Sequence, residues 1–164
     1  IDYDQNWLIY DEVYKSGMTT EQTHKVLTNK MGKRFFTSKI GDSAAVQEIA
    51  NLNTLPYSMG IESVKKTKDS ISAGIRLINE ALKVQEGTGK PKMFIAEHCK
   101  NLIYEFETYH YPDQKINRNA PEDPVKENDH ALDALRYAKL KMYYGNPNLK
   151  AYKPKKMLDR KYKR

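Results

Sequence analysis

Hydrophobic and polar positions follow two different periods along this chain, and the two periods predict strands and helices in turn. Runs rich in aromatic and β-branched residues predict strands, whereas apolar residues spaced three and four apart predict amphipathic helices. One helix has a capping box at its start, because Thr19 is followed three positions later by Gln22. The predicted strands span residues 7–14, 34–40, 60–64 and 93–96, and three of the predicted helices span residues 20–31, 44–52 and 100–109. Another predicted helix is capped by Asp69 or Ser70, carries Leu82 on its apolar face and is ended by the glycines at 87–89. This alternation favours an α/β or mixed α+β fold around one sheet.

A further amphipathic helix is predicted from residue 130, with Asn128 or Asp129 as its N-cap. Its apolar stripe has helical spacing and consists of Ala131, Leu135, Ala138 and Met142. Asp133 lies inside this helix among Ala and Leu, where aspartate is a poor helix former. His130 precedes it by three positions, so both side chains leave the helix on nearly the same side. A carboxylate and an imidazole at the edge of a buried face indicate a site for a hard divalent cation, with Asp129 as a cap or a group behind the ligands.

Length, cysteine content and charge restrict what the chain can be. Its 164 residues suit one domain, and a single cysteine, Cys99, excludes an internal disulfide. No apolar run approaches the roughly 18 residues of a membrane span. Residues 150–164 contain eight basic residues and one acidic residue, which equals the net charge of +7 of the whole chain. We therefore expect a folded domain over residues 1–144 and a basic tail over residues 145–164.

Such a tail indicates either contact with nucleic acid or a disordered solubilising segment. The tail residues predicted to bind nucleic acid are Lys153, Lys155, Lys156, Arg160 and Lys161. Nearer the middle of the chain, Lys65, Lys66 and Lys68 form a basic turn, which is a candidate phosphate-binding patch or a solvated loop.

Asp42 is the second acid of interest, because it ends a predicted strand just before a helix. Ligands gather at the carboxyl ends of strands in α/β sheets, but an Asp-Ser pair at this place is also an ordinary N-cap, and the two alternatives stand equal. Asp11, Glu12 and Glu105 are expected to be solvated, although Glu105 is placed to brace a site. Neither phosphate-binding glycine pattern occurs, and a nucleophile elbow is absent as well. The remaining chemistry is metal-assisted hydrolysis by carboxylates beside a basic surface.

Several of these segments, in order, resemble the C-terminal nuclease domain of tailed-phage terminase large subunits, the DNA-packaging enzymes. The matching segments are WLIYDEVY at 7–14, Gly41-Asp42-Ser43-Ala44, Gly60-Ile61, Lys66, Ser70-Ile71, Gly74-Ile75, Asn101-Leu102-Ile103 with Glu105 and Tyr109, and NDHALDALRYA at 128–138. The last segment resembles the closing motif of the family, which gives a histidine and a metal-binding aspartate. The resemblance covers about residues 1–143.

The resemblance implies a ribonuclease-H-like mixed sheet flanked by helices, with two Mg²⁺ or Mn²⁺ ions that hydrolyse double-stranded DNA. It makes Asp42 and Asp133 direct metal ligands and His130 a ligand or a neighbour of one. Residues 110–127 and the turn at Lys65–Lys68 would flank the DNA path. The partners implied are the small terminase subunit and the portal or procapsid, in the cytoplasm of a bacterial host, without a membrane.

The chain also departs from the family pattern. In the family a first aspartate lies on a strand upstream of the WLIYDEVY segment, whereas residues 1–4 resemble the turn that follows that strand. We therefore expect an N-terminally truncated domain without the packaging ATPase. Two hypotheses follow: a metal-dependent endonuclease domain, or a catalytically inactive terminase fragment that binds DNA or packaging partners.

Overall fold

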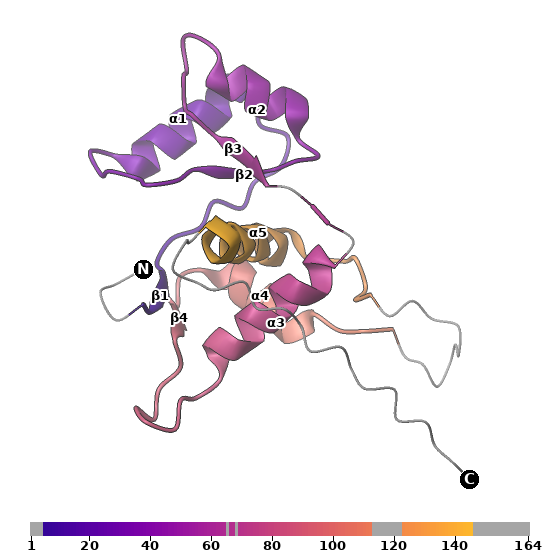
Figure 1. The fold of residues 1–164 in the computed structure, drawn as a ribbon. Helices are drawn as coiled ribbons and strands as arrows, with labels where there is room; N and C mark the ends of the chain where they lie inside the picture. Colours follow the sequence, from indigo (N-terminus) through magenta and orange to yellow (C-terminus); the bar gives the residue numbers. More distant parts are fainter. Residues whose placement is uncertain (1–4, 65, 68, 113–122, 146–164) are drawn as a thin grey trace.

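The computed structural model describes residues 5–64, 66–67, 69–112 and 123–145, which form five helices and four strands (Figure 1). Residues 146–164 of the basic tail, together with Lys65 and Lys68, lie outside the described residues. In chain order the elements are β1 (Trp7–Ile9), α1 (Thr20–Met31), β2 (Ile40–Asp42), α2 (Val46–Asn53), β3 (Glu62–Val64), α3 (Ser70–Leu82), β4 (Met93–Ile95), α4 (Lys100–Thr108) and α5 (His130–Gly145). The predicted alternation of strands and helices is confirmed.

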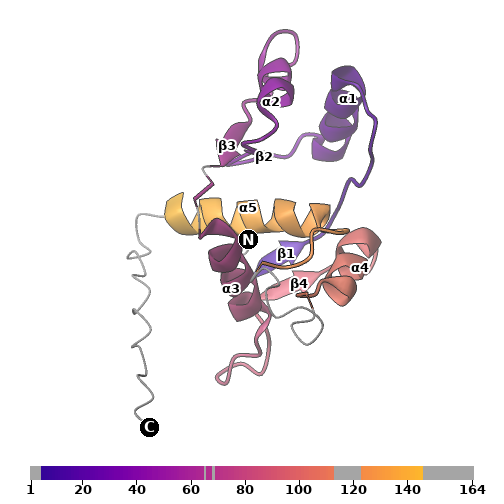
Figure 2. The ribbon, with the colours of Figure 1, turned by 90° about the vertical axis from the view of Figure 1, so that its right-hand side faces the viewer.

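Within the described residues the strands form two separate pairs and not one continuous sheet. β1 pairs with β4 and β2 pairs with β3, and both pairs are parallel. Figures 1 and 2 show α5 between the two pairs, with β2, β3, α1 and α2 on one side and β1, β4, α3 and α4 on the other. Asp42 thus ends a strand that faces α5.

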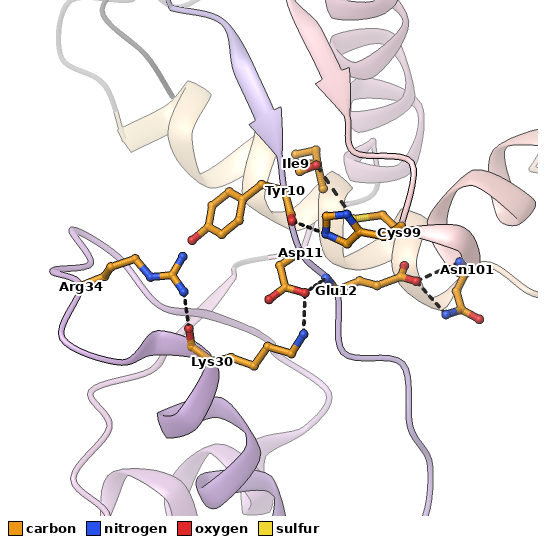
Figure 3. Close-up of polar contacts among 9 residues, drawn as sticks. Ile9, Tyr10, Asp11, Glu12, Lys30, Arg34, Cys99 and Asn101 are labelled. Atoms are coloured by element: carbon orange, nitrogen blue, oxygen red, sulfur yellow. Dashed lines mark hydrogen bonds and ion pairs between the residues drawn. The ribbon is translucent and has the colours of Figure 1, made fainter.

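The first strand is shorter than predicted because its acidic end has other partners. Only Trp7–Ile9 pairs with β4, and the chain then turns away. Asp11 forms an ion pair with Lys30 at 2.5 Å, and Glu12 accepts hydrogen bonds from Asn101 (Figure 3). Asp11 is exposed, as expected for a solvated acid, although it forms an ion pair. Glu12 is half-buried, so the expectation that it is solvated is only partly correct.

Helix α1 begins where its capping box predicts. The Gln22 N–H donates to the Thr19 hydroxyl at 3.2 Å, and the Thr19 N–H donates to the Gln22 side chain at 2.9 Å. Both bonds satisfy amide groups that the first helical turn cannot pair internally. This boundary is encoded by residues close in sequence, which is why it was predicted correctly.

Helix α5 packs against α3, α4 and β2, and its buried face differs from the predicted stripe. Leu135 is buried as predicted, but Met142 is exposed, and the stripe also misses Leu132 and Leu140, both of which are buried. The reason is that neighbours cover α5 on several sides, which widens its buried arc beyond one stripe. No helix in the described part of the chain is long and apolar enough to cross a membrane.

The main core lies where α3, α4 and α5 meet the β1–β4 pair. Its buried apolar residues are Ile78, Ala81, Met93, Cys99, Leu102, Leu132 and Leu135. Glu105 of α4 is also enclosed here, with 1% of its surface exposed, so the expectation that it is solvated is wrong. Its position beneath α5 removes it from water, which the pattern of α4 alone does not indicate.

Candidate functional site

The fold brings the two predicted metal-binding aspartates together at one tyrosine. Asp42 is the last residue of β2, and Asp133 lies in the first turn of α5. The Tyr137 hydroxyl lies 3.1 Å from Asp42 Oδ2 and 3.1 Å from Asp133 Oδ2. These two carboxylate oxygens are therefore separated by at most twice that distance. Because a phenol carries one proton, Tyr137 donates to one carboxylate at a time.

Asp42 is held by three donors. The Ala44 N–H donates to Asp42 Oδ1 at 2.8 Å, and the Lys66 ammonium lies 2.6 Å from the same oxygen. Burial raises the pKa of Asp42, but the hydrogen bonds from Ala44, Lys66 and Tyr137 outweigh burial, so the pKa is below its usual value. Asp42 is not the N-cap of α2, since that position is Ala45. The cap alternative is therefore wrong, although Asp42 does brace the turn before the helix.

Asp133 has a different environment from the one predicted. It lies in the first turn of α5, where the positive end of the helix dipole stabilises a carboxylate, and not in the helix interior. Tyr137 contacts Asp133 Oδ2, and the other carboxylate oxygen, Oδ1, pairs with the Arg136 guanidinium. The Arg136 side chain is 7% exposed, whereas that of Asp133 is 30% exposed. Asp133 thus has one side fixed by a buried cation and another open to solvent.

His130 faces the same space as the two aspartates. A cavity of about 210 Å³, which we name the Asp42–Asp133 cavity, is lined by Ile40, Asp42, His130, Asp133, Ala134 and Tyr137. All three predicted site residues therefore line one cavity. Within the described residues, no group of three or more His, Cys, Asp or Glu side chains is close enough to hold a metal ion.

The donor set nevertheless suits a hard cation. Mg²⁺ is typically bound through one or two carboxylates, with waters and substrate phosphates completing the shell. Asp42 and Asp133 supply two carboxylates on one cavity, each with an exposed portion of about a third. The residues present therefore fit Mg²⁺ or Mn²⁺: Asp42 and Asp133 would supply two carboxylate ligands, and water or substrate phosphate would supply the others.

Basic side chains gather beside the acids. A neighbouring cavity of about 220 Å³ is lined by three basic residues, Lys66, Lys126 and Arg136, and by three acidic residues, Asp123, Asp129 and Asp133. Lys66 also lies over the Tyr137 ring, 5.1 Å from its centroid. Of the predicted basic turn, Lys66 contacts the site, whereas the predictions for Lys65, Lys68, Lys153, Lys155, Lys156, Arg160 and Lys161 lie outside the described residues.

The sequence-based prediction missed two residues around the site. Arg136 and Tyr137 follow Asp133 by three and four positions, so helical spacing alone places them beside it. Lys126 lies in an irregular segment before α5, within the residues 110–127 that the family resemblance places along the DNA path. The signal that could have found Arg136 and Tyr137 was therefore present in the sequence.

The model of the family "Terminase RNAseH like domain" matches residues 2–140. The chain is similar to the crystal structure of the g2p (large terminase) nuclease domain from the bacteriophage SPP1 with bound Mn, at a TM-score of 0.62 and 24% sequence identity. That match covers 85% of this chain and 73% of the SPP1 chain. A comparison with curated proteins finds no match.

At this level of identity the structural likeness establishes the fold, and the family match covers most of the chain. The predicted ribonuclease-H-like α/β fold is confirmed, and so is the resemblance to terminases that the ordered motifs indicated. The chain belongs to the terminase RNase H-like domain family.

Proposed function

We propose that this domain is the metal-dependent endonuclease of a phage DNA-packaging terminase and hydrolyses phosphodiester bonds of double-stranded DNA. The observation that supports this most is the shared cavity, on which Asp42, His130 and Asp133 converge from β2 and α5. The neighbouring cavity adds Lys66, Lys126 and Arg136 as candidate phosphate contacts, alongside three aspartates, Asp123, Asp129 and Asp133, that line it too.

Asp42 and Asp133 would hold Mg²⁺ or Mn²⁺, and His130 would be a ligand or an immediate neighbour. The SPP1 nuclease domain, which has the same fold, was crystallised with bound Mn. When two such ions are bound, they activate water and stabilise the leaving oxygen of the phosphodiester. Two carboxylates that share Tyr137 as a neighbour are close enough to contribute to one such centre.

The remaining residues of the site control charge and orientation. Lys66 pairs with Asp42 and Arg136 pairs with Asp133, so neither carboxylate is left as an uncompensated charge. Lys66 and Lys126 face the neighbouring cavity, where they would attract the DNA backbone. Phosphate contacts of this kind carry no base information, so we expect cleavage with little sequence preference.

In a packaging motor the substrate would be concatemeric viral DNA in the host cytoplasm, and the partners would be the small terminase subunit and the portal. The basic tail at 145–164 would add sequence-independent affinity for DNA. If it does, deletion of residues 150–164 weakens DNA binding and reduces its salt dependence. Binding that is unchanged by the deletion would refute this role of the tail.

A second candidate is a terminase domain that binds DNA or packaging partners without cutting. The observation that favours it is the donor set, because the described residues hold no group of three or more metal-binding side chains. Under this hypothesis Lys66 and Arg136 would remain paired with the aspartates. DNA binding would then be independent of divalent cations.

Incubation of the chain with supercoiled plasmid and Mn²⁺ separates the two candidates. The endonuclease proposal predicts nicking that EDTA abolishes and that Asp133→Asn reduces by more than about 100-fold, because loss of a group behind the ligands already costs about 10- to 100-fold. Asp11→Asn is the matched control, since Asp11 is an exposed acid that pairs with Lys30 away from the Asp42–Asp133 cavity. Equal nicking by the wild type and Asp133→Asn, or none by the wild type, would favour the binding module.

A further inference from the structure

Glu105 is a buried carboxylate that bonds to the helix carrying the candidate site. It is 1% exposed and lies on α4, beneath α5. Its Oε2 accepts a hydrogen bond of 2.8 Å from the Leu132 N–H. Its Oε1 has no hydrogen-bond partner among the described residues. Tyr14 lies nearby, and interaction with Glu105 raises the pKa of its hydroxyl.

The bond to Leu132 satisfies an amide that α5 cannot pair internally. The Asp133 N–H donates to the Asp129 carbonyl at 2.8 Å, which makes Asp129 the residue at the N-cap position of α5. Leu132 is then the third helical residue, whose N–H usually bonds to the N-cap side chain. Here Glu105, 27 positions away, supplies the acceptor. The positive end of the helix dipole also favours a carboxylate at this place.

A second carboxylate fixes α4 in the same manner. Glu12, just beyond β1, accepts from the Asn101 N–H at 3.0 Å and from Asn101 Nδ2 at 2.8 Å (Figure 3). It also accepts from the Leu102 N–H at 3.0 Å. The start of α4 is therefore fastened to the end of β1, and the start of α5 is fastened to α4. Two carboxylates in series, Glu12 and Glu105, thus connect the strand pair to the first turn of α5.

Leu132 lies between His130 and Asp133 in that first turn. A shift of the α5 N-terminus would move both residues relative to Asp42, which belongs to β2. A leucine or methionine at position 105 would fill the space without the cost of burying a charge. The contributions that only an acceptor can make are the directional bond to Leu132 and the interaction with the Tyr14 hydroxyl, and only the first of these reaches α5.

We propose, on the basis of the proposed nuclease function, that Glu105 is a positioning residue that sets the register of His130 and Asp133 against Asp42 by bonding to the Leu132 N–H. Glu105 does not line the Asp42–Asp133 cavity. Its effect is on the distance between the two carboxylates that the metal requires, which depends on where the first turn of α5 lies.

The test compares Glu105→Gln, which keeps an acceptor oxygen, with Glu105→Leu, which does not. Thr19→Ala is the matched control, because it removes the cap of α1, a helix without site residues. The measurements are Mn²⁺ binding by electron paramagnetic resonance, kcat and KM for plasmid nicking, thermal unfolding, and hydrogen exchange of the Leu132 amide. We expect Glu105→Leu to weaken Mn²⁺ binding and lower kcat by about 10- to 100-fold with KM for DNA unchanged.

Glu105→Gln should recover most of the Mn²⁺ affinity and kcat, while the Leu132 amide should exchange faster in Glu105→Leu alone. Thr19→Ala should lower the melting temperature and leave kcat and Mn²⁺ affinity unchanged. The inference is overturned if Glu105→Leu lowers only the melting temperature, or if Gln and Leu have equal effects on kcat. If Glu105→Leu does not fold, a Gln variant with wild-type exchange and kcat supports the inference, and a Gln variant with strongly reduced kcat opposes it. If the wild type neither binds Mn²⁺ nor nicks DNA, the proposed function itself is refuted. That outcome differs from a failure of the Glu105 inference, in which the wild type is active.

Discussion

Gly74 of α3 lies where Arg136 of α5 crosses it, and this contact leaves no room for a side chain. A Cβ atom at position 74 would lie 2.1 Å from Arg136 Cγ and 2.7 Å from Arg136 Cδ. The Arg136 side chain is buried and pairs with Asp133, so it has little freedom to move away. We predict that Gly74→Ala displaces Arg136 and destabilises the domain.

Two opposing effects decide how much Gly74→Ala changes the free energy of unfolding. Alanine is favoured over glycine in a helix interior by about 1 kcal/mol. Insertion of a methyl group into a packed contact costs about 1–3 kcal/mol, and a contact of 2.1 Å places this case at the upper end. The net loss of unfolding free energy is then about 2 kcal/mol, which lowers the melting temperature of a domain of this size by about 4–8 °C.

Thermal and urea unfolding followed by circular dichroism measure this loss. Gly87→Ala is the matched control, because a Cβ at position 87 would have no atom within 4 Å, and we expect a change of less than about 0.5 kcal/mol. In an Arg136→Ala background the penalty of Gly74→Ala should disappear, since Arg136 Cβ would lie at an ordinary 3.5 Å. A melting temperature that rises in Gly74→Ala, or a penalty that persists in the double variant, would refute the reasoning.

Two further predictions concern ionised carboxylates. Burial raises the pKa of Glu12, but hydrogen bonds from Asn101 and Leu102 lower it by more, so the pKa in the folded state is below the ordinary 4.5. The ionised Glu12 therefore stabilises the folded domain above pH 4.5, and this stabilisation is lost as the pH falls through the folded-state pKa. Glu12→Gln should therefore destabilise the domain more at pH 7 than at pH 3 in urea unfolding; an equal effect at both values would contradict this. Lys66→Gln should raise the pKa of Asp42 towards its usual value in a carbon-detected NMR titration, because an ammonium at 2.6 Å is lost, and an unchanged pKa would show that Lys66 does not hold Asp42.

The parts of the fold that were predicted correctly are those encoded by neighbours in sequence. The capping box at Thr19 and Gln22 fixes the start of α1 without help from the rest of the chain. The strand at residues 7–14 was predicted too long because its limits depend on distant partners. Asp11 bonds to Lys30 and Glu12 bonds to the start of α4, contacts that no local pattern contains.

The candidate site divides in the same way. His130 and Asp133 were found from their spacing on one helix, and Tyr137 and Arg136 could have been found by the same rule. That Asp42 lies beside Asp133 is a tertiary fact, since it depends on the packing of β2 against α5. Only the resemblance to the terminase family indicated that pairing in advance.

Glu105 shows why burial of a charge is hard to predict from one sequence. A glutamate on an amphipathic helix is normally solvated, and the surrounding residues of α4 give no contrary signal. The Leu132 N–H, in the first turn of α5, supplies the hydrogen bond that makes the burial of this carboxylate tolerable. Such a partner becomes visible only when both helices are placed.

The central claim is that Asp42 and Asp133 together hold the metal used for DNA cleavage, and crystals soaked in Mn²⁺ test it most directly. The anomalous difference map should show a manganese peak in the Asp42–Asp133 cavity, within coordination distance of both carboxylates, and Asp133→Asn should remove it. A peak elsewhere, or a cavity in which Lys66 and Arg136 keep their pairing with the aspartates at saturating Mn²⁺, would contradict the claim.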